Sequence, residues 1–114
     1  MLASKFRLSK KKDIERVKNE GTLYQKDFFG AVVLEKQKGK DSRFAFVVST
    51  KISKHAFQRN RIKRALREAT RHHLYIIGKG YDILFLPKTN IVRKSTDEIM
   101  REVKLFILKD LDKK

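Results

Sequence analysis

The stretch of residues 51–73, KISKHAFQRNRIKRALREATRHH, constrains the fold most, because it combines a helical pattern with one-sided charge. Four apolar residues recur at the i, i+3, i+4, i+7 spacing of a buried helix face: Ile62, Ala65, Leu66 and Ala69. At about 100° per residue, the opposite side of such a helix carries a row of polar, mostly cationic residues: Asn60, Lys63, Arg64, Arg67 and Arg71. The pattern predicts a helix that packs on a core through one face and presents cations on the other.

Most charge runs are solvated helix surfaces, and this is the first alternative for the present one. Eight of the residues in 51–73 are Lys or Arg, and Glu68 is the single acid. A solvated helix usually mixes signs, because opposite charges at i, i+4 attract and like charges repel. Lys63 with Arg67, and Arg67 with Arg71, are like-charged pairs at that spacing. The pattern therefore favours a helix that binds a polyanion.

The composition of the whole chain has the same bias. With 114 residues the chain is long enough for one domain, residues 1–114, and its net charge is +16. Excess positive charge destabilises a compact state, so a polyanionic partner is its natural explanation. The absence of cysteine excludes disulfides, thiolate metal sites and cysteine nucleophiles, and it suits a reducing compartment. There is no apolar run of about 18 residues and no secretory signal, so we expect a cytoplasmic protein.

The remaining pattern predicts an α+β fold with element order α-β-β-α-β-α, arranged as a two-layer sandwich of helices on a small mixed sheet. We expect residues 1–8 to form a basic, flexible arm. Ser9 or Asp13 is expected to cap a first helix that ends at Gly21. Strands are predicted at 28–35 and 43–49, joined as an antiparallel hairpin by a polar turn at 36–42. The basic helix is expected to follow from a cap at Ser53 to residue 73, and a third strand to lie at 81–86. The last predicted element is a helix that starts with the capping box Ser95–Glu98.

With this motif and element order, the chain resembles the protein subunit of bacterial ribonuclease P over nearly its whole length. The residues that carry the resemblance are Lys51, Lys54 and Ala56, the run RNRIKR at 59–64, Arg67-Glu68, Phe6-Arg7-Leu8 with Asp13, and Gly21-Thr22 followed by Phe29. The resemblance implies a small αβ fold with a left-handed β-α-β crossover, although such crossovers are almost always right-handed.

The resemblance also implies a function. The protein would assist a catalytic RNA in the endonucleolytic removal of the 5′ leader from precursor tRNA, with the catalytic site and the Mg²⁺ on the RNA and no cofactor bound by the protein alone. Its partners would be that RNA subunit and precursor tRNA, without a membrane or a further protein. The residues expected to bind RNA are Lys51, Lys54, Arg59, Asn60, Arg61, Lys63, Arg64, Arg67 and Arg71.

A leader-binding cleft between the first helix and the sheet is the second site that the resemblance implies. Its expected residues are Phe6, Arg7, Ile14, Lys18, Phe28 and Val32. Positions 14 and 18 are commonly aromatic in the family, and a Tyr often occupies the position of Val32. Stacking on an aromatic residue contributes about 1–3 kcal/mol per base, so we expect the grip on the leader to depend here on charge and on Phe28.

Other functions share the charge pattern. A ribosomal or RNA-assembly protein would neutralise phosphates without a role in cleavage. A DNA-binding module would place residues 56–73 in the major groove, although an all-cationic face suits backbone contact better than base readout. Catalysis or metal binding by the chain itself is not expected, because the acids are scattered and His55, His72 and His73 have no carboxylates at ligand spacing. Arg59 lies nearer the apolar face than its neighbours, so a bridge between helix and sheet is its alternative role.

Overall fold

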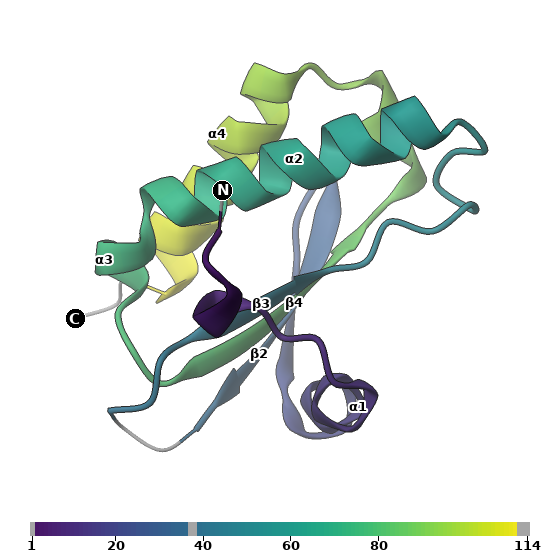
Figure 1. The fold of residues 1–114 in the computed structure, drawn as a ribbon. Coiled ribbons are helices and arrows are strands. Elements are labelled where there is room, and N and C mark those ends of the chain that lie inside the picture. Colours follow the sequence, from purple (N-terminus) through teal and green to yellow (C-terminus); the bar gives the residue numbers. More distant parts are fainter. Residues whose placement is uncertain (1, 37–38, 112–114) are drawn as a thin grey trace.

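The computed structural model describes residues 2–36 and 39–111 (Figure 1). Its helices are α1 (Lys11–Glu20), α2 (Ala56–His72), α3 (Leu74–Ile77) and α4 (Thr96–Phe106), and its strands are β1 (Thr22–Gln25), β2 (Phe29–Glu35), β3 (Arg43–Phe46) and β4 (Tyr81–Pro87). Short 3₁₀ turns at Ser4–Phe6 and Thr89–Arg93 precede α1 and α4, and a π-helical turn at Ile107–Leu111 follows α4. None of the described helices is long and apolar enough to cross a membrane.

The strands form one mixed sheet in the order β1-β2-β4-β3. β4 pairs antiparallel with β2 and parallel with β3, so the predicted hairpin of β2 with β3 is wrong. The apolar run of β4 takes the central position, where neighbours on both edges satisfy its backbone groups and its faces are buried. The start of β4 is held from both sides, since Lys36 N donates to Gly80 O at 2.7 Å and Gly80 N donates to Lys40 O at 2.9 Å.

The edge strand β1 is not predicted by the sequence pattern. It has four residues and is mostly exposed, so it lacks the apolar alternation that indicates a strand. It pairs antiparallel with β2, from Thr22 opposite Val33 to Gln25 opposite Gly30. The predicted polar turn follows β2, and Gly39 there has a φ of +90°, which glycine tolerates. Residues 37 and 38 of that turn lie outside the described residues.

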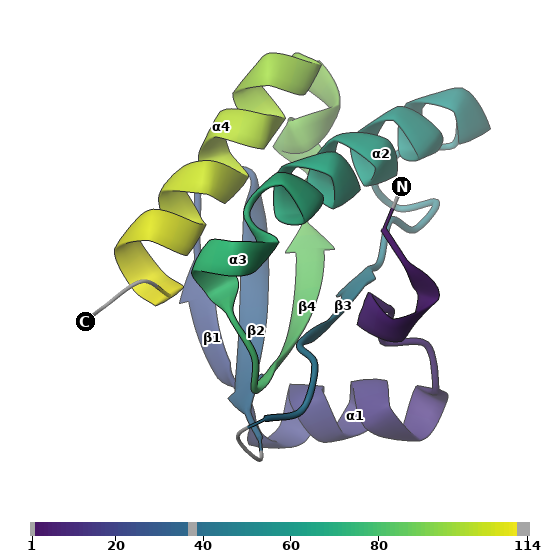
Figure 2. The ribbon, with the colours of Figure 1, turned by 60° about the vertical axis from the view of Figure 1, so that its left-hand side comes forward.

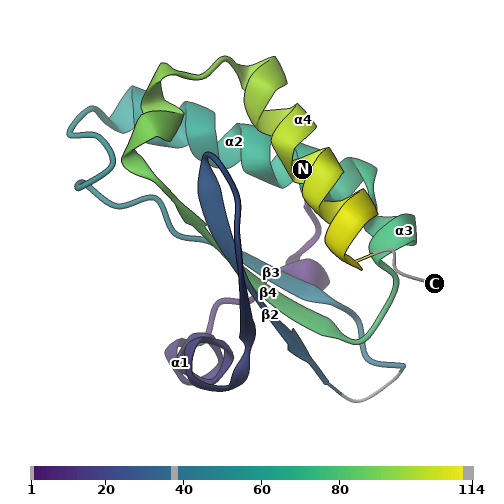
Figure 3. The ribbon, with the colours of Figure 1, turned by 180° about the vertical axis from the view of Figure 1, so that it is seen from behind.

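Helices cover both faces of the sheet (Figures 2 and 3). On one face α2 and α4 enclose the main core, where Phe29, Phe85 and Leu66 are fully buried. On the other face α1 covers a smaller core, in which Val17 packs with Val32. The α+β class is confirmed, and α1 adds a third layer to the predicted two.

The segment from β3 through α2 and α3 to β4 connects two neighbouring parallel strands. In Figure 2, β4 runs upward and lies to the left of β3, and the connecting helices lie in front of the sheet. A right-handed crossover would place the second strand on the right. The crossover is therefore left-handed, as the resemblance implied.

The predicted capping box of α4 is confirmed. Ser95 Oγ accepts a hydrogen bond from Glu98 N at 3.1 Å, and Glu98 Oε1 accepts one from Ser95 N at 3.0 Å. The predicted apolar face is buried as well, with Ile99, Val103 and Phe106 at most 1% exposed. Here the local signals and the tertiary packing agree.

The predicted cap of α1 is wrong. The helix begins after Lys10, and no side chain, neither that of Ser9 nor that of Asp13, caps it. The Asp13 carboxylate accepts a hydrogen bond from Arg43 on β3 instead, at 3.3 Å. The helix ends at Gly21 as predicted, with an ordinary negative φ.

Residues 2–8, expected as a flexible arm, lie against the body of the protein. Leu2 is 1% exposed in the main core, and Leu8 is 3% exposed in the smaller core. Leu8 N donates to Phe44 O at 2.8 Å, which fastens the segment beside β3. The N-terminal segment therefore helps to form the surface between α1 and α2.

Candidate nucleic-acid interface

Helix α2 packs on the core through the predicted face. The residues of that face are at most 2% exposed: Ile62, Ala65, Leu66 and Ala69. On the opposite side Asn60, Arg64 and Arg71 are exposed, whereas Lys63 and Arg67 are half-buried. The orientation of the basic helix is confirmed, and its cations face outward or toward a neighbouring surface.

The loop before α2 adds two exposed cations, Lys51 and Lys54. The predicted cap at Ser53 is wrong, because the helix begins two residues later, after His55. Ser53 Oγ accepts a hydrogen bond from His55 N at 3.1 Å and donates one to Gln58 Oε1 at 2.5 Å, so this hydroxyl connects the loop to a side chain of the first turn without capping the helix. Lys54 therefore directly precedes the N-cap residue His55, and Lys51 lies three residues earlier in the loop.

Two arginines of the motif make hydrogen bonds within the protein. Arg59 Nη1 donates to Ser53 O at 2.9 Å, so it ties the loop to its own helix and does not bridge to the sheet. Arg61 donates to Lys94 O at 3.0 Å and to Val92 O at 3.1 Å. Arg61 thus connects α2 to the segment before α4, a role that the sequence pattern did not indicate.

Arg71 is paired within its own helix. Its Nη2 lies 2.8 Å from Glu68 Oε1, and the hydrogen bond from Arg71 lowers the pKa of Glu68 to about 2. The same hydrogen bond raises the pKa of Arg71. A phosphate that binds Arg71 must therefore compete with a carboxylate already in place.

Lys63 and Arg67 line a groove with two of the residues predicted for the leader, Arg7 and Ile14. The groove has a volume of about 250 Å³ and lies among the N-terminal segment, α1, β3 and α2. Phe46 forms part of its wall. Ile14 is half-buried and packs against the smaller core. We refer to this hollow, defined by Arg7, Ile14, Phe46, Lys63 and Arg67, as the β3 groove.

The other four predicted leader residues lie elsewhere. Val32 is 6% exposed beneath α1, and Lys18 is exposed on that helix. Phe28 packs against the main core on the opposite face of the sheet, with the Lys94 ammonium 4.8 Å from the centre of its ring. Phe6 also packs against the main core. The six residues therefore do not form one surface.

Residues 2–110 of the chain match the protein family described as Ribonuclease P. The chain belongs to the ribonuclease P protein family. The ribonuclease P protein component of Thermotoga petrophila is 38% identical over 86 residues, which cover 75% of this chain and 71% of that protein. The component of Fusobacterium nucleatum is 37% identical over 81 residues, 71% of each chain. This family is the protein subunit of an endonuclease complex and implies an RNA subunit as the partner.

Solved structures of ribonuclease P proteins have the same fold. The protein from Staphylococcus aureus superposes with a TM-score of 0.83 at 26% identity, over 93% of this chain and 97% of that one. The protein from Thermotoga maritima superposes with a TM-score of 0.75 at 28% identity, over 93% and 94%. The fold of the chain is therefore the ribonuclease P protein fold.

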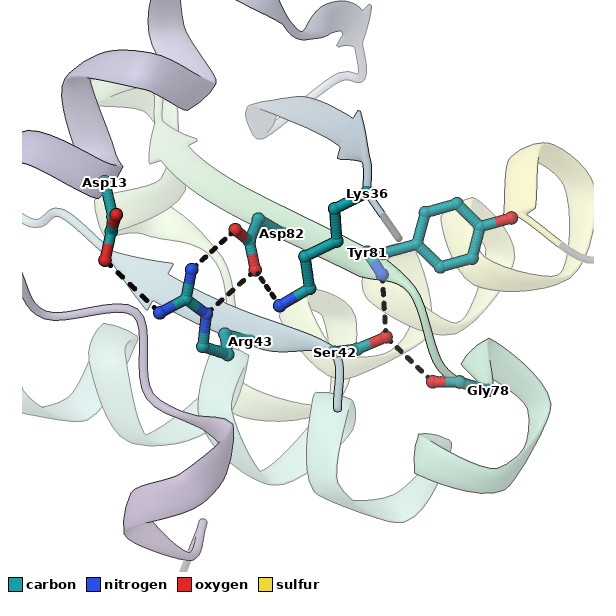
Figure 4. A network of polar contacts seen from close by, with 7 residues as sticks. All are labelled: Asp13, Lys36, Ser42, Arg43, Gly78, Tyr81 and Asp82. Carbon is teal, nitrogen blue, oxygen red and sulfur yellow. Dashed lines mark hydrogen bonds and ion pairs between the residues drawn. The ribbon is translucent and has the colours of Figure 1, made fainter. Parts of the chain in front are cut away.

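In this ribonuclease P family member, a polar network fastens α1 to the sheet (Figure 4). Its centre is Asp82 on β4, which is 4% exposed. The Asp82 carboxylate accepts hydrogen bonds from Arg43 Nε at 3.1 Å and Arg43 Nη2 at 2.8 Å, and it pairs with Lys36 Nζ at 2.8 Å. Arg43 Nη1 reaches Asp13 on α1 at 3.3 Å. The network therefore joins α1, β3, β4 and the end of β2.

The charges of this network stabilise one another. Burial disfavours the charged form of Asp82, but the hydrogen bonds from Arg43 and Lys36 outweigh it, so the pKa of Asp82 is lowered. The hydrogen bond with Asp82 also raises the pKa of Arg43. By holding Asp13, the network fixes the helix that carries Ile14 into the β3 groove. The polar network was not predicted from the sequence, although a single acid inside the apolar run YDILFL indicates a buried carboxylate that needs a cationic partner.

The histidines have other partners than a metal ion. His73 Nδ1 lies 2.7 Å from Ala69 O, and His72 Nε2 lies 3.9 Å from Glu68 Oε1. Within residues 2–36 and 39–111, no group of three His, Asp or Glu side chains is placed to hold a metal ion. The binding of Mg²⁺ through the RNA stays a prediction.

Proposed function

We propose that the chain is the RNA-binding protein subunit of ribonuclease P and that it assists the catalytic RNA in removing the 5′ leader from precursor tRNA. The observation that carries the proposal is the outward row of cations on α2, in the motif RNRIKR of a ribonuclease P family member. Lys and Arg that neutralise phosphates release counterions, which favours RNA binding and explains why so basic a chain is useful.

The polar residues on the outward side of α2 divide between two RNA surfaces in this proposal. Arg64 and Asn60 face solvent and contact the RNA subunit, Arg64 through phosphate oxygens and Asn60 through a 2′-hydroxyl or a base edge. Lys63 and Arg67 line the β3 groove and contact the phosphates of a single strand, the leader. Ile14 packs against the single-stranded leader but, having no aromatic ring, cannot stack on its bases. The grip on the leader is then salt-sensitive and only weakly base-selective.

The chemistry of cleavage belongs to the RNA in this proposal. Mg²⁺ bound by the RNA supplies charge stabilisation at the scissile phosphate. The protein neutralises phosphates on either side of the site and holds the leader, which raises the affinity of the complex for precursor tRNA over mature tRNA.

Single-turnover cleavage of a precursor tRNA by the cognate RNA, at low Mg²⁺ with and without the protein, tests the proposal. We expect the protein to accelerate cleavage, and no acceleration would contradict the assigned function. Arg67→Ala should weaken the acceleration. The matched control is Lys109→Ala, which removes an exposed cation from the C-terminal turn far along the chain from α2 and should retain it.

A role confined to RNA assembly makes a different prediction. An assembly protein would bind the complex of catalytic RNA and tRNA equally well with and without a 5′ leader. A leader-binding subunit would prefer the tRNA that carries one. The two affinities, measured at one salt concentration because phosphate contacts are salt-dependent, separate the functions.

A further inference from the structure

Phe57 is an exposed aromatic residue in the first turn of α2. Its side chain is 70% exposed. Helix geometry places it on the outward side, in one row with Asn60, Arg64 and Arg71, where it is the apolar member of a polar surface. Single exposed apolar residues are common on proteins and need no explanation by themselves. The surroundings of Phe57 are what distinguish it.

A second ring lies beside Phe57. The ring of His55 has its centroid 5.6 Å from that of Phe57, with the two planes tilted by 38°. His55 is exposed as well. Lys54 precedes this pair and is also exposed, so two aromatic rings face solvent among cations. This combination of π-faces and positive charge is the one by which proteins hold single-stranded nucleic acid.

The backbone beneath the rings is held in place. Arg59 Nη1 donates to Ser53 O at 2.9 Å, and His55 N donates to Ser53 Oγ at 3.1 Å. These bonds fasten the loop that carries His55 to the helix that carries Phe57. The backbone that carries the two rings is therefore ordered before any ligand binds, which lowers the ordering cost of binding.

We propose that Phe57, with His55 beside it, is a stacking site for an unpaired base of the catalytic RNA subunit. The inference rests on the proposed function and adds a contact that depends on a base and not on charge. Unpaired bases of RNA are typically held by stacking on aromatic side chains. Asn60, one turn further along the helix, can hydrogen-bond the edge of that base or its 2′-hydroxyl, and Arg64 can bind an adjoining phosphate. A second copy of this chain is a poor occupant, because the same cationic row would face itself.

The test compares Phe57→Leu with the unaltered protein in binding to the catalytic RNA. Affinity should fall by about 5- to 150-fold, which corresponds to the loss of one stacked base. The slope of log affinity against log salt should stay unchanged, because no charge is removed. The melting temperature should stay unchanged, since the ring is exposed. The matched control is Tyr75→Leu, which removes an aromatic ring that is 84% exposed on α3, beyond the row, and should leave affinity unchanged.

A direct readout is available because the chain contains no tryptophan. Phe57→Trp places a single indole at the site, and its fluorescence should be quenched when the RNA binds. Unaltered affinity of Phe57→Leu, equal losses for Phe57→Leu and Tyr75→Leu, or an indole that RNA does not quench would each overturn the stacking site. A dimer of the unaltered protein that Phe57→Leu abolishes would assign the rings to self-association instead. If the unaltered protein itself fails to bind the RNA, the proposed function fails and the stacking site with it.

Discussion

At the scale of single residues, arginines of one motif differ in what they contact in the free protein. Arg64 is exposed on the outward side of α2. Arg61, three residues earlier, donates to the carbonyls of Val92 and Lys94 and so joins two segments of the fold. Residue type and motif position do not separate these roles. The direction of the side chain from the helix does.

Replacement by alanine should therefore lower RNA affinity at position 64 and stability at position 61. Arg64→Ala should lower affinity for the catalytic RNA and reduce the slope of log affinity against log salt by about 0.7–0.9, the contribution of one phosphate contact. Its melting temperature should stay unchanged. Arg61→Ala should instead lower the free energy of unfolding by about 1–3 kcal/mol, because two carbonyls lose a charged donor. Salt-dependent binding and urea unfolding of both variants check this; an unchanged salt slope for Arg64→Ala would show a merely solvated side chain.

At the scale of elements, the sequence predicts what depends on local pattern. The orientation of α2 follows from the spacing of Ile62 and Leu66, because a helix buries whichever face is apolar. The capping box of α4 is equally local. The position of β4 between β2 and β3 is not, since a strand buried on both faces can pair with several neighbours and only the whole sheet decides which. The hairpin prediction failed for that reason.

In the candidate site, too, the features that depend on local pattern were predictable and those that depend on the whole sheet were not. The cations of α2 were predictable because they share one helix face. The leader residues were not, because their meeting depends on which side of the sheet each one faces. Phe28 and Val32 have the even spacing of one strand face, yet Phe28 precedes β2 and packs against the main core, whereas Val32 lies under α1. The alternation of side chains assigns residues to the two faces of a sheet only within one strand, and Phe28 lies before β2 begins.

The network at Asp82, which joins four elements, gives a prediction for pH. The pKa of Asp82 in the folded protein is lowered, so its stabilising contribution is present above the unfolded pKa of about 3.9 and is lost as pH falls through the folded value. Asp82→Asn should destabilise the protein by about 3–5 kcal/mol at neutral pH, because Arg43 and Lys36 lose a buried counter-charge. The difference from the unaltered protein should narrow below about pH 4.

Urea unfolding at several pH values measures this difference. Asp97→Asn is the control, since Asp97 is exposed in the first turn of α4 and should change stability by less than about 1 kcal/mol. Equal stability of Asp82→Asn and the unaltered protein at neutral pH would show that the network contributes nothing net. A difference that persists in acid would assign the loss to packing and not to charge.

At the scale of the whole molecule, charge is the dominant feature. The chain has 29 Lys and Arg against 13 Asp and Glu. Its buried carboxylate, Asp82, is paired, and Glu68 is paired with Arg71 on the surface. Within residues 2–36 and 39–111, Arg71 is the only cation of the outward row of α2 that forms an ion pair, so the other cations of the row and those of the loop before it repel one another. Ions or polyanions that neutralise these cations should therefore stabilise the folded protein.

Salt should consequently raise the stability of the free protein. The screening length shortens from about 10 Å at 0.1 M to about 3 Å at 1 M, which weakens repulsion among exposed cations more than attraction within close, partly buried pairs such as Arg43 with Asp82. Between low salt and about 0.5 M NaCl the melting temperature should rise, by about 4–8 °C for each kcal/mol of repulsion removed. A short polyanion at equal ionic strength should raise it further, because it binds the folded state. A melting temperature that falls with NaCl would mean that ion pairs, not repulsion among the excess cations, govern the electrostatics of the fold.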